Sequence, residues 1–311
     1  MDFVHKSVLF TECMTALNIS PDGIYVDGTL GGGGHSKGIC ERLSDKGMLI
    51  GIDRDPEALK AAGEKLAEFS GKTKFVHSNY SEIKNILKDL SVSGIDGALL
   101  DLGVSSYQLD NASRGFSYMK DAPLDMRMNP EDTISAYNIV NEYGREELAH
   151  VIKEYGEERF AFKIASAIVK KREAKPIKTT LELADIIKYA MPPAARNSGG
   201  NPCKRTFQAL RIEVNHELDL LKGSLSDFFD SLNPGGRLAV ITFHSLEDRI
   251  VKTLFSDLTV GCICDKNIPV CVCGNKPKGK LIAKKPIVAT DEELKENTRS
   301  HSAKLRIIEK L

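Results

Sequence analysis

Residues 27–36 of this chain read DGTLGGGGHS, a glycine run placed directly after a short apolar stretch. The apolar residues 24–26 predict a buried parallel strand, and residues 36–43 predict a helix with Ser36 as its N-cap. A second apolar strand, residues 48–52, leads to Asp53. Glycines at a strand-to-helix turn expose backbone N–H groups to a ligand, and an acid about 20 residues later can bind both hydroxyls of a ribose. The pattern therefore predicts a nucleoside-binding site.

The spacing of the glycines separates two kinds of nucleoside ligand. The dinucleotide fingerprint G-x-G-x-x-G, started at Gly31, would need a glycine where this chain has Ser36. Enzymes that use S-adenosylmethionine prefer an acid before the glycines, and Asp27 supplies one. A glycine-rich turn without a ligand is the alternative, although four consecutive glycines carry a large cost in backbone entropy. The spacing thus favours S-adenosylmethionine over a dinucleotide.

Length and composition place few limits on the class of protein. The chain has 311 residues, enough for one large domain or for two smaller domains with cores of their own. Its hydrophobic content of 41% and charged content of 28% are ordinary for a globular protein. No apolar run approaches the length of a membrane span, and the first residues lack the pattern of a signal peptide. We therefore expect a cytoplasmic location and no membrane partner.

The net charge is zero, which argues against a protein that coats nucleic acid by bulk electrostatics. Two local basic patches remain. The first contains Lys163, Lys170, Lys171, Arg172, Lys175 and Lys178, and the second contains Lys276, Lys278, Lys280, Lys284 and Lys285. A solvated helix face explains the first patch as well as a phosphate-binding role does. The second patch has no acid within it and lies in a Gly/Pro-rich loop, which favours phosphate binding.

The chain has seven cysteines, and this odd number favours a reducing compartment. Two C-x-C pairs occur in one loop and consist of Cys262, Cys264, Cys271 and Cys273. Zinc sites more often use C-x-x-C spacing, so the sequence leaves open both reduced surface thiols without metal and a structural zinc site. The other cysteines are expected to be small apolar residues, and they are Cys13, Cys40 and Cys203.

Strands and helices alternate through the first third of the chain. Residues 74–77 predict a third strand, and residues 95–100 predict a fourth strand that ends at Asp101. Such alternation is typical of a doubly wound parallel sheet, whose ligands bind beyond the carboxyl ends of the strands. Asp27, Asp53 and Asp101 all stand at strand ends, so we expect them to lie together near the ligand.

Tyr80 and His244 each have a structural and a functional interpretation. Tyr80 follows the third strand, where its ring could cover a bound adenine or pack on the surface. His244 follows a strand expected at residues 237–243, where it could face a substrate or serve as a hydrogen-bonded structural residue. The sequence leaves both alternatives open for both residues.

The alternation stops after the fourth strand. Residues 105–128 show neither helical nor strand period, as active-site loops often do. Residues 135–191 show helical spacing and predict an inserted helical domain. Residues 207–229 predict one long helix that returns the chain to the sheet. The segments 281–288 and 302–308 predict the antiparallel pair that closes the sheet.

Several blocks of residues run through the chain in order. They are HKSVL at 5–9, DGTLGGGGHS at 27–36, DLGVSS at 101–106, RGFS at 114–117, PLDMRM at 123–128, TFQALR at 206–211 and FHSLEDR at 243–249. Together they resemble one family, the bacterial 16S rRNA (cytosine-N4) methyltransferases of the MraW/RsmH type. The resemblance spans nearly the whole chain and is far more specific than a glycine turn alone.

The resemblance implies an α/β fold, a Rossmann-like S-adenosylmethionine-dependent methyltransferase sheet with an inserted all-helical domain. The methyltransferase domain would comprise residues 1–108 and 205–311, and the inserted substrate-recognition domain residues 109–204. The residues expected to bind S-adenosylmethionine are Gly33, Gly34, His35, Asp53, Tyr80, Asp101 and Gln108. Among these, Asp53 would hold the ribose and Tyr80 would lie near the adenine.

The resemblance also implies methylation of the exocyclic N4 of a specific cytidine in the decoding region of 16S rRNA, within the small ribosomal subunit. That amine is a weak nucleophile because its lone pair is delocalised into the ring, so positioning and a hydrogen-bond acceptor should carry the catalysis without a metal. We expect Asp101, or otherwise Asp125, to be the acceptor. A methyltransferase acting on a small molecule or on another RNA is the alternative, and a non-catalytic RNA-binding protein is a further one.

Overall fold

The computed structural model describes residues 7–196, 201–265, 270 and 273–311. The chain forms two compact units, which we call the sheet unit (Met1–Gly103 with Leu218–Leu311) and the helical unit (Val104–Glu217). The use of the helical unit for substrate recognition stays a prediction. Within the described ranges, no helix combines the length and the apolar character needed to cross a membrane.

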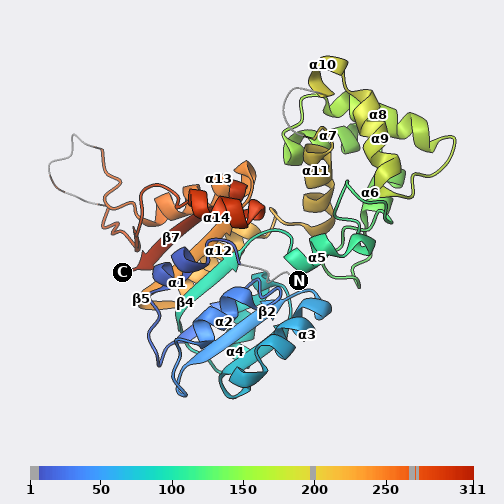
Figure 1. The fold of residues 1–311 in the computed structure, drawn as a ribbon. Coiled ribbons are helices and arrows are strands. Elements are labelled where there is room, and N and C mark those ends of the chain that lie inside the picture. Colours follow the sequence, from blue (N-terminus) through green and yellow to red (C-terminus); the bar gives the residue numbers. More distant parts are fainter. Residues whose placement is uncertain (1–6, 197–200, 266–269, 271–272) are drawn as a thin grey trace. The chain divides into compact units, whose positions relative to one another are not determined.

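In the described part of the chain, the sheet unit contains a seven-stranded sheet in the order β3-β2-β1-β4-β5-β7-β6 (Figure 1). The strands are β1 (Ile24–Asp27), β2 (Met48–Asp53), β3 (Thr73–His77), β4 (Ile95–Asp101), β5 (Leu232–Thr242), β6 (Gly279–Leu281) and β7 (Lys304–Lys310). The first five strands pair in parallel, and β7 runs antiparallel to both β5 and β6. The predicted doubly wound α/β sheet is therefore confirmed.

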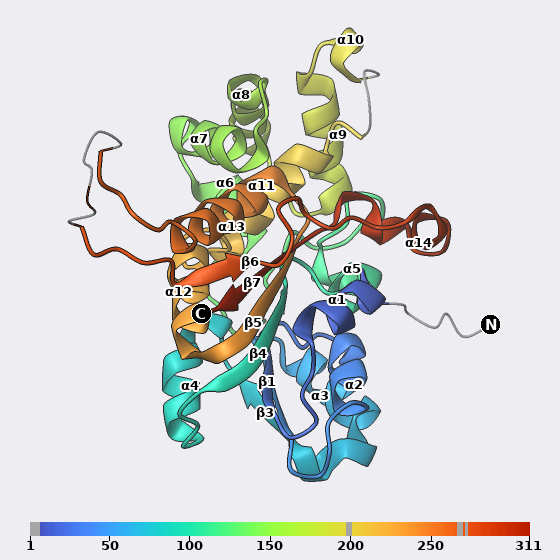
Figure 2. The ribbon, with the colours of Figure 1, turned by 90° about the vertical axis from the view of Figure 1, so that its left-hand side faces the viewer.

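Helices cover both faces of the sheet. They are α1 (Phe10–Leu17), α2 (Gly34–Cys40), α3 (Pro56–Lys65), α4 (Ile83–Asp89), α12 (Leu221–Ser231) and α13 (Ser245–Leu258). Side chains alternate along each strand, so Tyr25 packs into the core formed with α1, α2 and α3, whereas Val26 packs into the core formed with α4, α12 and α13. Figure 2 shows α1, α2 and α3 on one side of the sheet and α4 and α12 on the other.

The prediction that Ser36 is an N-cap is wrong. Helix α2 begins at Gly34, and its N-cap is Gly33, whose φ of 71° lies in the left-handed region. Ser36 is buried within the helix, where its hydroxyl donates to Oδ2 of Asp27 at 2.7 Å. A glycine can adopt the left-handed conformation without strain, so the helix starts three residues earlier than a cap at Ser36 would allow.

The prediction of one long helix over 207–229 is also wrong. Two helices occupy this stretch, α11 (Lys204–Asn215) in the helical unit and α12 in the sheet unit. The chain leaves the helical conformation at His216, which has a φ of 50°. Apolar spacing reports which side chains become buried and not whether the backbone is continuous, so the pattern runs through the break.

The closing strand pair has different bounds from those expected. Strand β6 ends at Leu281, so most of the segment 281–288 lies outside it, and Ile287 contributes only an isolated bridge to Leu305. Pro286 has no backbone N–H to donate to a ladder, which weakens strand formation here. The second member of the pair, β7, begins at Lys304 as a regular antiparallel neighbour of β5.

The helical unit has its own apolar core. Its helices include α6 (Ala136–Glu142), α7 (Arg145–Gly156), α8 (Ala161–Arg172), α9 (Thr180–Ala190), α10 (Pro193–Arg196) and α11. Their apolar stripes bury Ile152, Ile168, Ile187 and Leu210 in a single cluster. The predicted helical insertion is confirmed by this cluster.

The loop 105–128 is more ordered than its irregular sequence pattern indicates. It contains the short helices α5 (Ser106–Asp110) and η3 (Ala112–Arg114), which its apolar spacing does not predict. Further along, the buried Asn215 of α11 holds the chain by donating to the carbonyl of Met126 at 2.8 Å and accepting from the N–H of Met128 at 2.8 Å. The side-chain amide of Asn215 thus satisfies two backbone groups of this segment, as a neighbouring strand would do in a sheet.

Asn215→Ala is expected to lower the free energy of unfolding of the helical unit by about 1–3 kcal/mol, because it leaves two buried backbone groups without partners. Amide hydrogen exchange in the peptide containing Met128 should accelerate strongly. The exposed Asn85→Ala serves as the matched control and should change stability by no more than about 0.5 kcal/mol. Unchanged exchange at Met128 in the Asn215 variant would contradict the assignment.

Candidate functional site

Three acids stand at the carboxyl ends of adjacent strands. Asp27 is the last residue of β1, Asp53 of β2 and Asp101 of β4. Because β1 lies between β2 and β4 in the sheet, the three strand ends are neighbours. The sequence prediction that these acids lie together at one edge is confirmed.

Asp27 holds the glycine turn through two hydrogen bonds. Its side chain is buried, with Oδ2 accepting from the hydroxyl of Ser36 at 2.7 Å and Oδ1 accepting from the N–H of Thr29 at 3.2 Å. Burial raises the pKa of Asp27 to about 6, against the opposing effect of these hydrogen bonds. Both oxygens are engaged within the protein, so this carboxylate holds the turn and does not face a ligand.

Asp53 fixes the middle of the same turn. Its Oδ2 accepts from the N–H of Gly31 at 2.8 Å, and its Oδ1 accepts from the N–H of Asp55 at 2.9 Å. Burial raises the pKa of Asp53 to about 6, which these hydrogen bonds partly offset. Each carboxylate oxygen can accept a second hydrogen bond, so Asp53 keeps capacity for the hydroxyls of a ribose.

The glycines of the turn serve different purposes. Gly31 and Gly33 have φ values of 48° and 71°, in the left-handed region that disfavours other residues. A Cβ added at Gly32 would meet nothing within 4 Å, so the backbone here borders open space. The turn therefore requires glycine at two positions and exposes its backbone at the position between them.

Asp101 differs from the other two acids because one oxygen of its carboxylate makes no hydrogen bond within the described part of the chain. Its side chain is 27% exposed, yet its Oδ1 is buried and has no hydrogen-bond partner among the described residues. Burial raises the pKa of Asp101 to about 6, and nearby His35 lowers it. A buried carboxylate oxygen without a donor is costly, and such groups commonly await a donor from a ligand.

His35 lies between this carboxylate and the N-terminal segment. Its Nε2 is 2.9 Å from the carbonyl of Val8, which can only accept, so Nε2 carries the hydrogen. Its Nδ1 is 3.8 Å from Oδ2 of Asp101, and its ring stacks on Phe10 with centroids 6.2 Å apart. The imidazole is buried by these neighbours and is oriented by the N-terminal segment.

Tyr80 also reaches this region. It opens the short helix η2 (Tyr80–Glu82) directly after β3, and its side chain packs against the core of the sheet unit. Its Cβ would lie 3.3 Å from a Cβ built at Gly28, at the start of the glycine turn. The structure thus brings Tyr80 beside the turn, as its predicted role near an adenine requires.

Gln108 and Asp125 belong to the helical unit. Gln108 is buried in α5, where its Oε1 accepts from the N–H of Ser105 at 3.0 Å. Asp125 is held by Arg127, with Oδ1 2.8 Å from Nε and Oδ2 2.7 Å from a terminal nitrogen. Burial raises the pKa of Asp125, but the hydrogen bonds and charge of Arg127 outweigh it and leave that pKa lowered. Asp125 is therefore the weaker base of the two acids considered as acceptors.

His244 lies at the start of α13, next to the buried Glu247. It is the N-cap of α13, and its Nε2 lies 3.1 Å from Oε1 of the buried Glu247. Oε2 of Glu247 accepts from the N–H groups of Phe243 and His244 at 2.9 and 3.3 Å. These contacts cap α13, whereas the buried Nε2 of His244 makes no hydrogen bond within the described residues, so both interpretations of His244 stay open.

The N-terminal segment, whose apolar spacing predicts a helix at the cofactor end of the sheet, is held in place by a distant part of the chain. Leu9 has a φ of 52°, and its N–H donates to Oε1 of Glu293 at 2.8 Å, near the other end of the chain. Glu293 belongs to α14 (Asp291–Glu296). The block HKSVL was the available signal for the N-terminal residues, whereas nothing in the spacing indicated Glu293.

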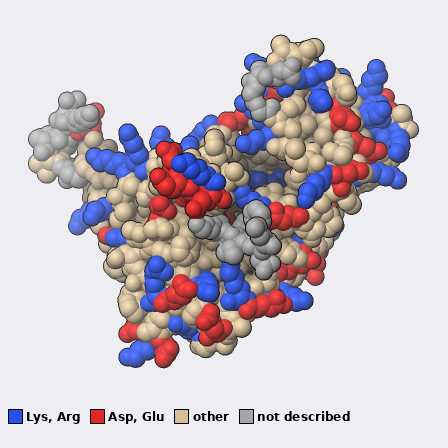
Figure 3. Space-filling view, in the orientation of Figure 1, with Lys and Arg blue, Asp and Glu red and all other residues tan. Residues whose placement is uncertain are grey.

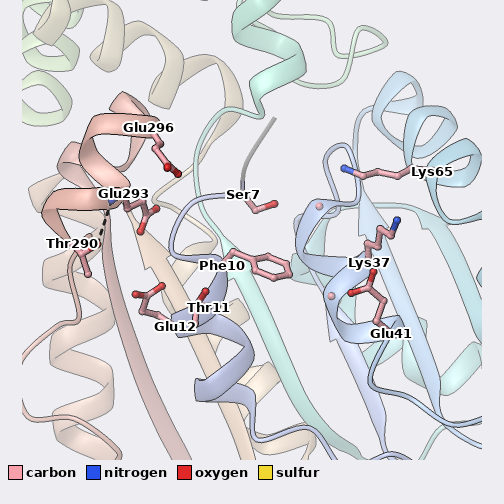
Figure 4. Close-up of a pocket in the computed structure, with 12 residues that line it drawn as sticks. Ser7, Phe10, Thr11, Glu12, Lys37, Glu41, Lys65, Thr290, Glu293 and Glu296 are labelled. Atoms are coloured by element: carbon pink, nitrogen blue, oxygen red, sulfur yellow. Dashed lines mark hydrogen bonds between the residues drawn. The ribbon is translucent and has the colours of Figure 1, made fainter. Parts of the chain in front are cut away.

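A pocket of about 430 Å³ lies beside the glycine turn and includes Gly34 (Figure 4). Lys37 and Lys65 stand on one side of it, and Glu293 and Glu296 stand on the other. Desolvation lowers the pKa of Lys65, and the charge of Lys37 lowers it further. Glu12 and Glu41 also line the pocket, so its acids outnumber its lysines, and Asp53, Tyr80 and Asp101 are not among its lining residues.

Comparisons with known proteins agree over the full length of the chain. Residues 2–311 match the model of the MraW methylase family. The chain is 57% identical over 311 residues to ribosomal RNA small subunit methyltransferase H 2 of Agathobacter rectalis, covering 100% of this chain and 99% of that protein. It is 54% identical to ribosomal RNA small subunit methyltransferase H of Clostridioides difficile, covering 100% of both chains.

Matches to solved structures are weaker. One is a rRNA methylase from Streptococcus thermophilus, with a TM-score of 0.44 and 10% sequence identity. The match covers 99% of this chain and 98% of that one.

Asp101→Asn is expected to stabilise the ligand-free protein at neutral pH. The pKa of this carboxyl is about 6 when folded and about 3.9 when unfolded, so between these values the folded state holds a proton that the unfolded state has released. Wild-type stability therefore falls as the pH rises through this window. Asparagine does not titrate, so its gain of about 1–3 kcal/mol should appear above pH ~6 and vanish near pH ~3.

Thermal unfolding at several pH values measures this difference. The exposed Asp45→Asn is the matched control, and its effect should be small at every pH. A gain in the Asp101 variant that is equal at low and neutral pH would show that burial of the charged carboxylate is not its cause.

Proposed function

The chain belongs to the MraW methylase family, and from this premise we propose that it methylates the exocyclic N4 of a specific cytidine in the decoding region of 16S rRNA, with S-adenosylmethionine as the methyl donor. The observation that carries the proposal is the full-length identity of 57% to a protein named as a small-subunit ribosomal RNA methyltransferase. The strand-end acids and the glycine turn support the same chemistry.

The residues of the sheet unit fit S-adenosylmethionine. Asp53 would hold the ribose hydroxyls, Tyr80 would pack near the adenine, and the backbone of the turn at Gly33, Gly34 and His35 would pass close to the cofactor. The cofactor, when bound, supplies an electrophilic methyl group on a sulfonium. The roles of these individual residues, and of Gln108, are part of the proposal.

The unpartnered Oδ1 of Asp101 is the observation that tests this fit. A buried acceptor without a donor matches a ligand that brings N–H groups, and both the ammonium of the cofactor and the amine of cytosine do so. The donor set of the site therefore fits the cofactor.

Asp101 would act on the amine of the target base. Cytosine N4 loses a proton as its new bond to carbon forms, and a carboxylate that accepts from its N–H increases the electron density on nitrogen. A pKa raised to about 6 leaves Asp101 ionised at neutral pH but more basic than an ordinary aspartate. Asp125, with its lowered pKa and its two bonds to Arg127, is the weaker candidate.

The basic patch of the helical unit offers a surface for the phosphate backbone. Lys163, Lys170, Lys171 and Lys175 are exposed, and Figure 3 shows lysine and arginine side chains gathered where α8 and α9 lie. Arg172 is not available for this role, because its guanidinium donates to the backbone carbonyls of α6 and the residue after it. A small-molecule substrate would have no use for this surface.

The proposed reaction is tested by mass spectrometry of nucleosides from 16S rRNA in a strain that lacks the gene. We expect N4-methylated cytidine to disappear from the decoding-region fragment and to return when the wild-type gene is restored. An unchanged nucleoside profile would reject rRNA as the substrate, and a small-molecule methyltransferase would then be the remaining enzyme class.

Asp101→Asn is expected to lower kcat by about 10²-fold or more, because the variant loses its proton acceptor. Wild-type kcat/KM for small subunits should rise with pH through about 6 as Asp101 ionises, and the variant should lose this dependence. Methyl transfer to small subunits under saturating cofactor measures both effects, with calorimetry reporting cofactor affinity separately.

Asp125→Asn is the matched comparison in the helical unit and should keep kcat within about tenfold of wild type. If the Asp101 variant turned over normally while binding cofactor normally, Asp101 could not be the acceptor. A larger loss in the Asp125 variant would transfer that role to Asp125.

A further inference from the structure

Three cysteine side chains converge in the loop between α13 and β6. The Sγ atoms of Cys262, Cys264 and Cys273 all lie within 4.8 Å of one another. The Sγ atoms of Cys262 and Cys273 are 3.8 Å apart, far longer than the bond of about 2.05 Å in a disulfide. Two sulfur ligands placed about 2.3 Å from a tetrahedral zinc ion are separated by about 3.8 Å. The separation of Cys262 and Cys273 is therefore compatible with two thiolates bound to one metal ion.

Backbone N–H groups point at one of these sulfur atoms. Sγ of Cys273 accepts from the N–H of Ile263 and from the N–H of Asn275, each at 3.4 Å. Donors of this kind stabilise negative charge on sulfur and orient it, as the outer hydrogen bonds of metal ligands do. The loop backbone is therefore arranged for a thiolate at Cys273.

Hydrogen bonds join the two arms of the loop, residues 258–261 and residues 275–278, close to the sulfur atoms. The side-chain amide of Asn275 donates to the carbonyls of Val260 and Gly261 at 3.1 and 2.6 Å. The N–H of Lys278 donates to the carbonyl of Leu258 at 2.9 Å. Gly274, with a φ of 62°, adopts a left-handed conformation directly after Cys273. These contacts hold Cys262 and Cys273 opposite each other.

The described apolar residues at the start of this loop are largely exposed. Val260 is 42% exposed and Ile263 is 67% exposed, so neither contributes to a core. A long loop without a core loses much conformational entropy when it orders, and a cross-link between its arms reduces that cost. A metal ion bound by cysteines of both arms supplies such a cross-link.

We propose that Cys262, Cys264 and Cys273 bind a structural zinc ion as thiolates. Each thiol releases its proton on binding, and the metal keeps its oxidation state, so no oxidant takes part. Thiolate ligands select zinc over magnesium and calcium, which prefer oxygen. The sequence prediction also includes Cys271, which lies outside the described residues. The proposal is independent of the methyltransferase function.

The test uses the full-length protein purified under reducing conditions. Elemental analysis should find one zinc per chain, and replacement by cobalt should produce thiolate-to-metal charge-transfer absorption. Cys262→Ser and Cys273→Ser should each weaken metal binding by more than about 100-fold, since each removes a direct ligand. Cys203→Ala, which removes a buried thiol of the helical unit, is the matched control and should leave the metal content unchanged.

Removal of zinc from the wild-type protein by a chelator gives a readout that does not depend on the folding of a variant. Proteolysis within residues 259–278 should accelerate, while the sheet unit keeps its circular dichroism. Protein that contains no zinc and develops no cobalt absorption would overturn the proposal. So would equal metal loss in the Cys203 variant, or a mass two hydrogens lower that locates a disulfide between Cys262 and Cys273.

Discussion

The buried carboxylate of Asp27 is the contact on which the rest of the site depends. It joins the end of β1 to the turn at Thr29 and to the first turn of α2 at Ser36. Asp53 holds the same turn through Gly31, and the hydroxyl of Thr29 accepts from the N–H of Asp101 at 2.6 Å. Three neighbouring strand ends are thereby connected to one glycine turn, so its exposed backbone keeps a defined shape before any ligand binds.

The three buried acids lower the stability of the folded protein at neutral pH, and one of them leaves a carboxylate oxygen that a ligand can bind. Burial raises the pKa of each to about 6, so each is harder to ionise in the folded protein than in the unfolded chain. For Asp27 and Asp53, hydrogen bonds to the turn offset part of this cost. Asp101 receives no such bond at its Oδ1, and this uncompensated position is where a ligand can gain most by binding.

A series of hydrogen bonds links His35, beside the glycine turn, to segments near both ends of the chain. Its Nε2 donates to Val8, the next residue, Leu9, donates to Glu293, and Glu293 also accepts from the hydroxyl of Ser300. These bonds join segments separated by up to 284 positions. The N-terminal segment therefore orients the imidazole facing Asp101, which makes it part of the site and not a passive extension.

Much of the fold could be predicted from the sequence, because strand–helix alternation, the glycine turn and the acids at strand ends are local patterns with a periodic or positional signature. The break at His216, the cap at Gly33 and the short β6 could not, since apolar spacing reports burial and not backbone continuity. Contacts between distant segments also needed the tertiary structure, as with Val8 and His35, Leu9 and Glu293, and the sulfur atoms of Cys262 and Cys273. The sequence alone therefore determined that a glycine turn and three acids stand at strand ends, because these are local patterns. Only folding decided which of their atoms are engaged within the protein and which, like Oδ1 of Asp101, have no partner among the described residues.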